Sequence, residues 1–440
     1  MGDPPGDTAV YPINRPAGII TADCIKLTAN HQLTSSQFLS FALRAPYVKN
    51  SLLEQTKGVA QQKLSLERFR QVPLPLPPLN EQSRILSKLE SLLARSRRAK
   101  EALNAVPALL ERFRQSVLAS AFRGDLTADW RAQHPDVEPA SQLLERIRAE
   151  RRRRWEEAEL EKMRSKSKVP KDSAWREKYE EPSLRTDPDS PAPHWFADLD
   201  ALGWSAAPLE LLADPVRGIP YGIVQTGDPH PSGVPTVRCG DLKDFNIELT
   251  NLKRVDPNVA GQYGRTRLAG GEVLLAIRGT VGGVAVASLE MAGMNISREV
   301  AMVPPLPDVN PRYLMYLLAS PVGARILAGH TKGVAQSGVN LDDIRSFPVP
   351  IPSVEEQKEI VKHIDRALAS LSSVNAAWRQ AFERLDVLAQ ATLAKAFRGE
   401  LVPQDPNDEP ASVLLERIRA EREASDGSTP KRSRGRRPAA

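Results

Sequence analysis

The feature that most constrains this chain is a long repeat in its sequence. The two copies are separated by a constant number of residues, the distance along the chain from Thr56 to Thr331, which we call the repeat interval. The hexapeptide Thr-Lys-Gly-Val-Ala-Gln occurs at residues 56–61 and again at 331–336. The ungapped match extends to Leu126 and Leu401, with more than one third of the aligned positions identical. Solenoid units are only roughly 20 to 50 residues long, so this is a duplicated module. A duplication of this size predicts pseudo-twofold symmetry and a target that is itself divided in two.

Each copy contains a long segment whose apolar residues alternate at spacings of four and three. The first runs from Ile85 to Val117 and the second from Ile360 to Thr392. A sustained period of 3.5 residues is typical of a coiled-coil seam. About 45 residues at roughly 1.5 Å each predict two rods of roughly 65 Å, the first kinked at Pro107. The simplest partner for each rod is the other one, in antiparallel orientation. The alternative is that each helix packs on its own domain or on a second chain.

Glycines are expected to end both rods, at Gly124 and Gly399, because glycine readily adopts the left-handed conformation after a helix. A shorter helix is predicted after each rod, at about residues 141–163 and 412–423. These helices share the sequence Leu-Leu-Glu-Arg-Ile-Arg-Ala-Glu-Arg. Residues 165–193 are polar, contain prolines and lack periodicity, which predicts an exposed linker.

After Trp204 the pattern changes to short apolar runs separated by glycine turns. Residues 273–277 and 284–287 are predicted strands, and residues 313–327 are predicted to be largely helical. The expected fold class is therefore α/β, with mixed α+β domains plus two long helices in an antiparallel coiled coil. The first domain is expected to be incomplete, because the stretch from Trp204 to the second hexapeptide is more than twice as long as the stretch that precedes the first.

Composition limits the possible functions only partly. The net charge of +6 and the sequence pI of about 9.2 permit nucleic-acid binding without establishing it. Residues 204–355 carry 13 Lys and Arg against 14 Asp and Glu, and basic runs lie at 151–154 and 431–437. We expect those runs to be solvated arms. The two cysteines, Cys24 and Cys239, favour a reducing cytoplasm. No apolar run reaches the roughly 18 residues of a membrane span, so a soluble cytoplasmic protein is expected.

Three short motifs resemble catalytic ones but are better explained by structure. Residues 310–313 depart from the Asn-Pro-Pro-Tyr of amino-methyltransferases at the third position. Glu356 and Lys358 have the spacing of a metal-dependent nuclease, yet Ser353 and Glu356 predict a capping box at a helix start. Residues 279–283 lack the Gly-Lys-Ser/Thr of a phosphate loop and predict a hairpin turn. We therefore expect no catalytic residue, no metal ligand and no cofactor in this chain.

Several motifs occur together in both copies. The second domain begins with Gly-Ile-Pro-Tyr-Gly-Ile-Val-Gln at residues 218–225. Each copy then has the hexapeptide, a Pro-x-Pro-x-Pro ladder, a Glu-Gln helix opening and an Ala-Phe-Arg-Gly-Asp/Glu-Leu helix end. Over essentially the whole chain, this combination resembles the specificity subunit of type I restriction–modification enzymes.

The resemblance implies two target-recognition domains, each reading one half of a bipartite site in double-stranded DNA. Two antiparallel helices would hold these domains at the spacing of the half-sites. It also implies docking to modification (methyltransferase) subunits, which carry S-adenosylmethionine, and to restriction/translocase subunits, with no membrane partner. The domains it implies are a partial first recognition domain at 1–78, the first long and short helices at 79–164, a linker at 165–203, the second recognition domain at 204–353, the second long and short helices at 354–424, and a basic tail at 425–440.

The predicted DNA contacts lie mostly in residues 253–278, which carry five positive charges against Asp256 and Glu272. Arginine bound to guanine is the commonest specific base contact. The candidates are Tyr221, Lys253, Arg254, Arg265, Arg267, Arg278 and Lys332. Two other functions stay open. One is a coiled-coil scaffold that binds no DNA, and the other is a detached specificity segment of a fused restriction–methylation enzyme.

Overall fold

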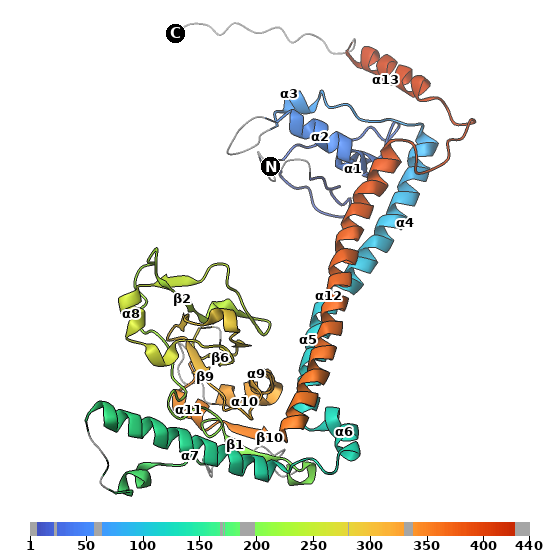
Figure 1. Ribbon diagram of the computed structural model, residues 1–440. Coiled ribbons are helices and arrows are strands. Elements are labelled where there is room, and N and C mark those ends of the chain that lie inside the picture. Colours follow the sequence, from blue (N-terminus) through green and yellow to red (C-terminus); the bar gives the residue numbers. More distant parts are fainter. Residues whose placement is uncertain are drawn as a thin grey trace, which may run out of the picture. The chain divides into compact units, whose positions relative to one another are not determined.

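The computed structural model describes residues 7–21, 24–56, 64–167, 170, 172–184, 199–279, 281–329 and 338–426 (Figure 1). The chain divides into two compact units, each combining one domain with parts of both long helices. Unit 1 contains residues 1–107 and 374–440, and unit 2 contains residues 108–373. The longest helix, α12 (Val354–Phe397), contributes its first part to unit 2 and its second part to unit 1.

The secondary structure described in unit 1 is helical. Its first helix has a serine cap, because Ser35 Oγ accepts a hydrogen bond from the N–H of Phe38 at 3.1 Å. The core of unit 1 gathers Phe38, Ile85, Leu89 and Phe397, which are buried in one cluster. Besides part of α12, the helices of unit 1 are α1 (Ser36–Arg44), α2 (Pro46–Glu54), α3 (Leu66–Phe69), α4 (Leu79–Leu103) and α13 (Ala411–Asp426).

Unit 2 adds small sheets to its helices. Strand β6 is the centre of an antiparallel sheet of order β7-β6-β9, and all four of its residues are buried. A second sheet has the order β5-β2-β8, while β1 pairs with β10 and β3 with β4. The strands are β1 (Ser205–Pro208), β2 (Val234–Val237), β3 (Leu242–Lys243), β4 (Asn246–Ile247), β5 (Lys253–Val255), β6 (Val273–Ala276), β7 (Val284–Val286), β8 (Asn295–Ile296), β9 (Val300–Val303) and β10 (Pro348–Ile351).

The helices of unit 2 pack with the β7-β6-β9 sheet and with β1 and β10 in one buried core, which also contains the start of α12 (Figure 1). The predicted helix at 313–327 is two helices, because Ser320 lies between them in an extended conformation. Strands β6 and β7 pair as the predicted hairpin, and Thr280 in the connecting turn lies outside the described residues. The helices are α5 (Val106–Phe122), α6 (Ala128–Gln133), α7 (Ala140–Ser165), α8 (Pro257–Gly261), α9 (Pro311–Ala319), α10 (Pro321–Gly329) and α11 (Leu341–Arg345).

The two long helical segments pair in antiparallel orientation, as predicted. In unit 1, Lys100 Nζ lies 2.6 Å from Asp386 Oδ1, and Trp378 Nε1 donates to the carbonyl of Leu103 at 2.8 Å. In unit 2, the end of α5 is buried together with the start of α12. Leu103 and Trp378 are separated by the repeat interval, so equivalent positions of the two copies meet at this contact. A kink was predicted at Pro107, and the rod is in fact interrupted just before it, because α4 ends at Leu103 and α5 begins at Val106.

The structural repeat extends beyond the repeat seen in the sequence. Helices α9 and α10 have the bounds of α1 and α2 shifted by the repeat interval, although few amino acids are identical there. The ring pair Phe122–Tyr313 in unit 2 has centroids 5.4 Å apart at 64°. Its counterpart Phe38–Phe397 in unit 1 has centroids 5.3 Å apart at 61°. Each helix-end phenylalanine therefore packs on the domain of the other copy, so the same contact occurs within both units, as the repeat predicts.

Three expectations about exposure were wrong in part: those for the coiled-coil seam, for the segment at 165–193 and for the basic run at 151–154. The seam is not buried along its whole length: Phe113 is 52% exposed, and Val374 and Leu388 are also exposed, because two helices alone bury only a narrow strip. The segment at 165–193 is not exposed throughout, since Trp175 is buried and stacks on Trp155 with centroids 6.1 Å apart.

The run at 151–154 is not simply a solvated arm. Arg151 is buried and donates to the carbonyl of Ala213, and Arg154 Nη1 donates to Asp214 at 3.0 Å. These contacts fix α7 to the start of the second domain. Among the described residues, no helix is both long enough and apolar enough to cross a membrane.

Candidate nucleic-acid interface

The motif at residues 218–225 forms a loop that lies against the strands of unit 2. The N–H of Ile223 donates to the carbonyl of Ile296 at 2.8 Å, and the N–H of Arg298 donates to the carbonyl of Ile223 at 2.9 Å. A Cβ on Gly222 would lie 1.8 Å from the carbonyl oxygen of Ile296, so only glycine fits here. The backbone is therefore held closely while the side chain of Tyr221 remains exposed. We call residues 218–225 the glycine loop.

Two predicted contacts lie on β5, beside the glycine loop. Lys253 Nζ donates to Thr226 Oγ1 at 2.9 Å, just after the loop ends. Arg254 is exposed and donates to the carbonyl of Gly233 at 3.2 Å. Both line a cavity of about 650 Å³ that also includes Arg238. Strand β5 thus brings two of the predicted cations next to the loop that carries Tyr221.

Arg265 and Arg267 are positioned by a residue that was not predicted. Arg217 immediately precedes the glycine loop, and its guanidinium donates to the carbonyls of Arg265 at 3.3 Å and Arg267 at 2.7 Å. It also forms an ion pair of 2.6 Å with Glu272, which is buried. Because Arg217 holds the backbone carbonyls, the side chains of Arg265 and Arg267 stay exposed.

Arg278 lies just after the end of β6. It is close to residues 297–299, the segment that the glycine loop also contacts. Its N–H donates to the carbonyl of Glu299 at 3.3 Å, and its side chain is exposed. Neighbouring Arg298 is also exposed and was missed, because a single arginine between Ser297 and Glu299 gives no signal in the sequence. Lys332 lies outside the described residues.

The cations of this surface differ in how free they are to bind an anion. Arg238 is bonded to Asp241, with Nη2 to Oδ1 at 3.1 Å, and this hydrogen bond raises the pKa of Arg238. By contrast, no ion pair is recorded among the described residues for Arg254, Arg265, Arg267, Arg278 or Arg298. Exposed arginines without a carboxylate partner are suited to phosphate oxygens and to base edges. We call Tyr221 together with these five arginines and Lys253 the basic surface.

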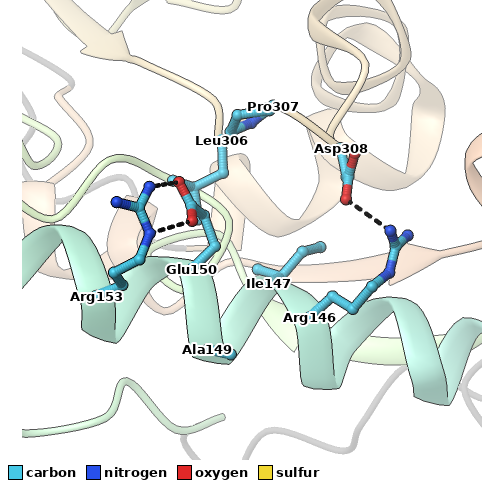
Figure 2. A pocket seen from close by; sticks show the side chains of 8 residues that line it. All are labelled: Arg146, Ile147, Ala149, Glu150, Arg153, Leu306, Pro307 and Asp308. Carbon is cyan, nitrogen blue, oxygen red and sulfur yellow. Dashed lines mark hydrogen bonds and ion pairs between the residues drawn. The ribbon is translucent and has the colours of Figure 1, made fainter.

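A pocket of about 400 Å³ between α7 and residues 306–308 is a second candidate binding site. Figure 2 shows that its charged groups are already paired: Arg153 reaches Glu150 at 2.8 Å, and Arg146 reaches Asp308 at 3.2 Å. Ile147, from the same helix, belongs to the buried core of unit 2. The pocket is therefore best explained as part of the packing between α7 and the domain.

Glu356, the acidic residue of the nuclease-like motif, connects the domain to the helices through its hydrogen bonds. Ser353 Oγ accepts from the N–H of Glu356 at 3.1 Å, which is the predicted helix cap. The other half of the predicted capping box is absent among the described residues. Instead, the buried Glu356 carboxylate accepts from Thr127 Oγ1 at 2.7 Å, from Trp204 Nε1 at 2.8 Å and from Arg131. All its hydrogen bonds thus go to neighbouring elements of unit 2.

Comparison with known proteins adds independent findings. Residues 9–107 and 232–377 match the family described as "Type I restriction modification DNA specificity domain". The specificity subunit of the type I restriction enzyme EcoBI from Escherichia coli is 30% identical over 418 residues, covering 93% of this chain and 76% of that one. The EcoKI specificity subunit from Escherichia coli strain K12 is 25% identical over 417 residues, covering 92% and 75%.

Among solved structures, one is described as "Structural basis underlying complex assembly and conformational transition of the type I R-M system". It aligns with a TM-score of 0.52 and 20% identity, covering 84% of this chain and 73% of that one. At this level of identity the match supports the fold alone. The fold class predicted from the sequence is in accord with it.

Proposed function

This chain belongs to the family of type I restriction–modification specificity subunits, and we propose that the basic surface of unit 2 reads one part of its DNA target. The observation that carries the proposal is the glycine loop. Its backbone is held closely at Gly222, and it carries Tyr221 itself. Arg298 bonds to the loop at Ile223, Lys253 bonds to Thr226 just after it, and Arg278 bonds to Glu299 beside Arg298. Base-edge contacts provide specificity while phosphate contacts mainly fix position, so a domain with almost no net charge can still specify a sequence.

We also propose that the chain acts as the reading and docking part of a larger assembly. The specificity subunits it resembles are named as parts of restriction enzymes, which supports partners in the form of modification subunits and restriction/translocase subunits. The helical segments at 79–164 and 354–424 would set the separation of the two domains. The chain itself would carry no catalytic step, and the commitment of Glu356 to a structural joint supports this.

The test is a binding comparison of single variants across a set of duplexes, with modification subunits present. If Arg278 reads guanine, Arg278→Ala should cost about 1–3 kcal/mol at one base position only. If it contacts phosphate, all duplexes should weaken alike and the slope of log K against log salt should fall by about one. Arg164→Ala is the matched control, because Arg164 is an exposed arginine on α7.

The same comparison should be made for Lys253, Arg254, Arg265, Arg267 and Arg298. Binding to duplex DNA that survives all six alanine variants without loss would reject the basic surface as the reader. Absence of duplex binding by the unmodified assembly would favour the scaffold function instead.

A further inference from the structure

Arg217 connects two parts of the basic surface that lie far apart in the chain. It immediately precedes the glycine loop, which carries Tyr221. Its guanidinium reaches the segment that carries Arg265 and Arg267. We call residues 263–267 the arginine turn. Because no continuous stretch of backbone joins the loop to the turn directly, their relative position depends on side-chain contacts of this kind.

Each nitrogen of the Arg217 guanidinium has its own acceptor. Nε donates to the carbonyl of Arg265 at 3.3 Å, and Nη2 donates to the carbonyl of Arg267 at 2.7 Å. Nη1 pairs with the buried carboxylate of Glu272 at 2.6 Å, and Nη2 also donates to Met302 Sδ at 3.1 Å. A lysine has one nitrogen, so it would keep the ion pair but would not span both carbonyls. Since these donors are directed at the protein and the side chain is only 25% exposed, Arg217 is suited to holding other groups in place.

The backbone of Arg217 is also held by hydrogen bonds. Its N–H donates to Asp214 Oδ1 at 3.1 Å, and the other oxygen of that carboxylate accepts from Arg154 of α7 at 3.0 Å. The N–H of Gly218 donates to the carbonyl of Asp214 at 2.9 Å, and Gly218 has a φ of 62°, which favours glycine. The side chain of Arg217 therefore extends from a backbone that is anchored to α7.

A second contact joins the arginine turn to the other end of the glycine loop. The N–H of Val224 donates to Tyr263 Oη at 3.4 Å. Within the turn, Thr266 Oγ1 donates to the buried Oδ1 of Asn295 at 2.6 Å, and Asn295 Nδ2 donates to the carbonyl of Tyr263 at 3.2 Å. The turn is thus bonded to the loop on one side and to β8 on the other, while its two arginine side chains stay exposed.

We propose that Arg217 and Tyr263 are positioning residues that hold the arginine turn against the glycine loop. The two arginines of the turn then reach the same part of the DNA target as Tyr221. This inference rests on the proposed reading of DNA by the basic surface. A reading side chain must be held to within about 0.5 Å of its productive position, and a long arginine gains this from a fixed backbone. The fixed backbone also reduces the entropy that is lost when DNA binds.

The experiment is a double-mutant cycle for duplex binding, with modification subunits present. Arg265→Ala and Arg267→Ala are made together, once in the unmodified chain and once in the Arg217→Lys variant. The loss of affinity that they cause should be at least about threefold smaller in Arg217→Lys, because arginines that are already displaced contribute less to binding. Arg278→Ala is the matched control, since Arg278 belongs to the same surface and its backbone is held by Glu299. Its loss should be the same in both backgrounds.

The control also separates positioning from a general effect on the fold. Melting of unit 2 and hydrogen exchange of β6 report whether the Arg217→Lys variant is folded. If Arg217 only stabilises the domain, the cycle shows no coupling that is specific to the arginine turn. A loss for the two arginines that is equal in both backgrounds, or that changes as much as the loss for Arg278→Ala, would overturn the proposal.

Tyr263→Phe carries the test if the Arg217→Lys variant does not fold. It removes the acceptor of the Val224 N–H and keeps the aromatic ring. The loss caused by the two alanine changes should shrink about twofold in this background, less than in Arg217→Lys because the hydrogen bond is long. An unchanged loss refutes the proposal.

Failure of the proposed function gives a different result. If neither the two alanine changes nor Arg278→Ala weakens binding by the unmodified chain, the basic surface does not read DNA, and the positioning role falls with it. If these changes weaken binding but show no coupling to Arg217 or Tyr263, the basic surface remains the reader and the positioning role alone is rejected.

Discussion

Helices α7 and α13 contain the same nine residues but are buried to very different extents. The sequence Leu-Leu-Glu-Arg-Ile-Arg-Ala-Glu-Arg starts at Leu143 in α7 and at Leu414 in α13. Leu144 is 4% exposed, whereas its counterpart Leu415 is 44% exposed. Helix α7 packs along β1 and bonds to Ala213, both of which lie in the stretch without a described counterpart in unit 1. The local sequence therefore determines that a helix forms, and the tertiary partner determines whether it is buried.

Where both partners of a contact are among the described residues, the two units agree closely. Gln82 Nε2 donates to the carbonyl of Leu33 at 3.1 Å, and Gln357 Nε2 reaches the counterpart carbonyl of Asp308 at 3.5 Å. Both glutamines also donate to the carbonyl of the preceding proline ladder, at 2.9 Å and 3.2 Å. The difference between α7 and α13 thus reflects the neighbours of each helix rather than a general divergence of the two copies.

The largest expected effect comes from truncating the leucine that distinguishes the two helices. Leu144→Ala should destabilise unit 2 by about 2–5 kcal/mol, because it removes buried methyl groups and leaves a cavity. The matched variant Leu415→Ala should change stability by less than about 0.5 kcal/mol, since that side chain is largely in solvent. Chemical denaturation followed by hydrogen exchange of each unit measures both. Equal losses would mean that α13 is packed in solution as firmly as α7.

Much of the fold could be predicted from periodicity and from the repeat. The alternating four-three spacing identified both long helices, and Pro107 identified the break between α4 and α5. The central strand β6 was recognisable because its buried residues form a continuous apolar run. Exposure was predicted less well: Trp175 and Arg151 lie in polar, charged stretches, and only their tertiary contacts show that they are buried.

The candidate site could be predicted only as a set of residue types. Arg254, Arg265, Arg267 and Arg278 lie in a locally basic stretch, which was visible in the sequence. Arg217 was not distinguishable, because its role depends on two carbonyls far along the chain, those of Arg265 and Arg267. Glu356 was predicted to be part of a helix cap. That prediction explains its place at the start of α12 but not the hydrogen bonds that its carboxylate accepts from Thr127, Trp204 and Arg131. Long-range hydrogen bonds of this kind leave no periodic pattern.

A smaller effect is expected from removing the indole of Trp204, which donates a hydrogen bond to Glu356 at the start of α12. Trp204→Phe should destabilise unit 2 by about 1.5–3 kcal/mol, because a hydrogen bond to a charged, buried acceptor is lost. Unit 1 should be unaffected, since its counterpart Glu81 has no such donor among the described residues. A double-mutant cycle with Glu356→Gln separates the hydrogen bond from packing. If Trp204→Phe costs the same in both backgrounds, the ring matters through packing alone.

The smallest effect concerns the charges on the outer face of α7. Hydrogen bonds from Arg153 and then Arg154 lower the pKa of Glu150 from its ordinary 4.5 to about 2. In α13 the counterpart is Glu421, and Ala424 and Ser425 replace the two arginines. Because the pKa of Glu150 is lower in the folded state, its contribution to stability is present above about pH 4.5 and disappears as the pH falls toward 2.

Glu150→Gln should therefore lower the melting temperature of unit 2 slightly at pH 6, and the difference from the unmodified chain should shrink toward pH 3. The effect is small because exposed ion pairs are worth little. Glu421→Gln is the matched control and should leave unit 1 unchanged at both pH values. High salt should reduce the effect of Glu150→Gln in the same way as acid does, since screening weakens exposed charge pairs. A difference that does not shrink at all between pH 6 and pH 3 would show that Glu150 stabilises α7 through packing rather than through its charge.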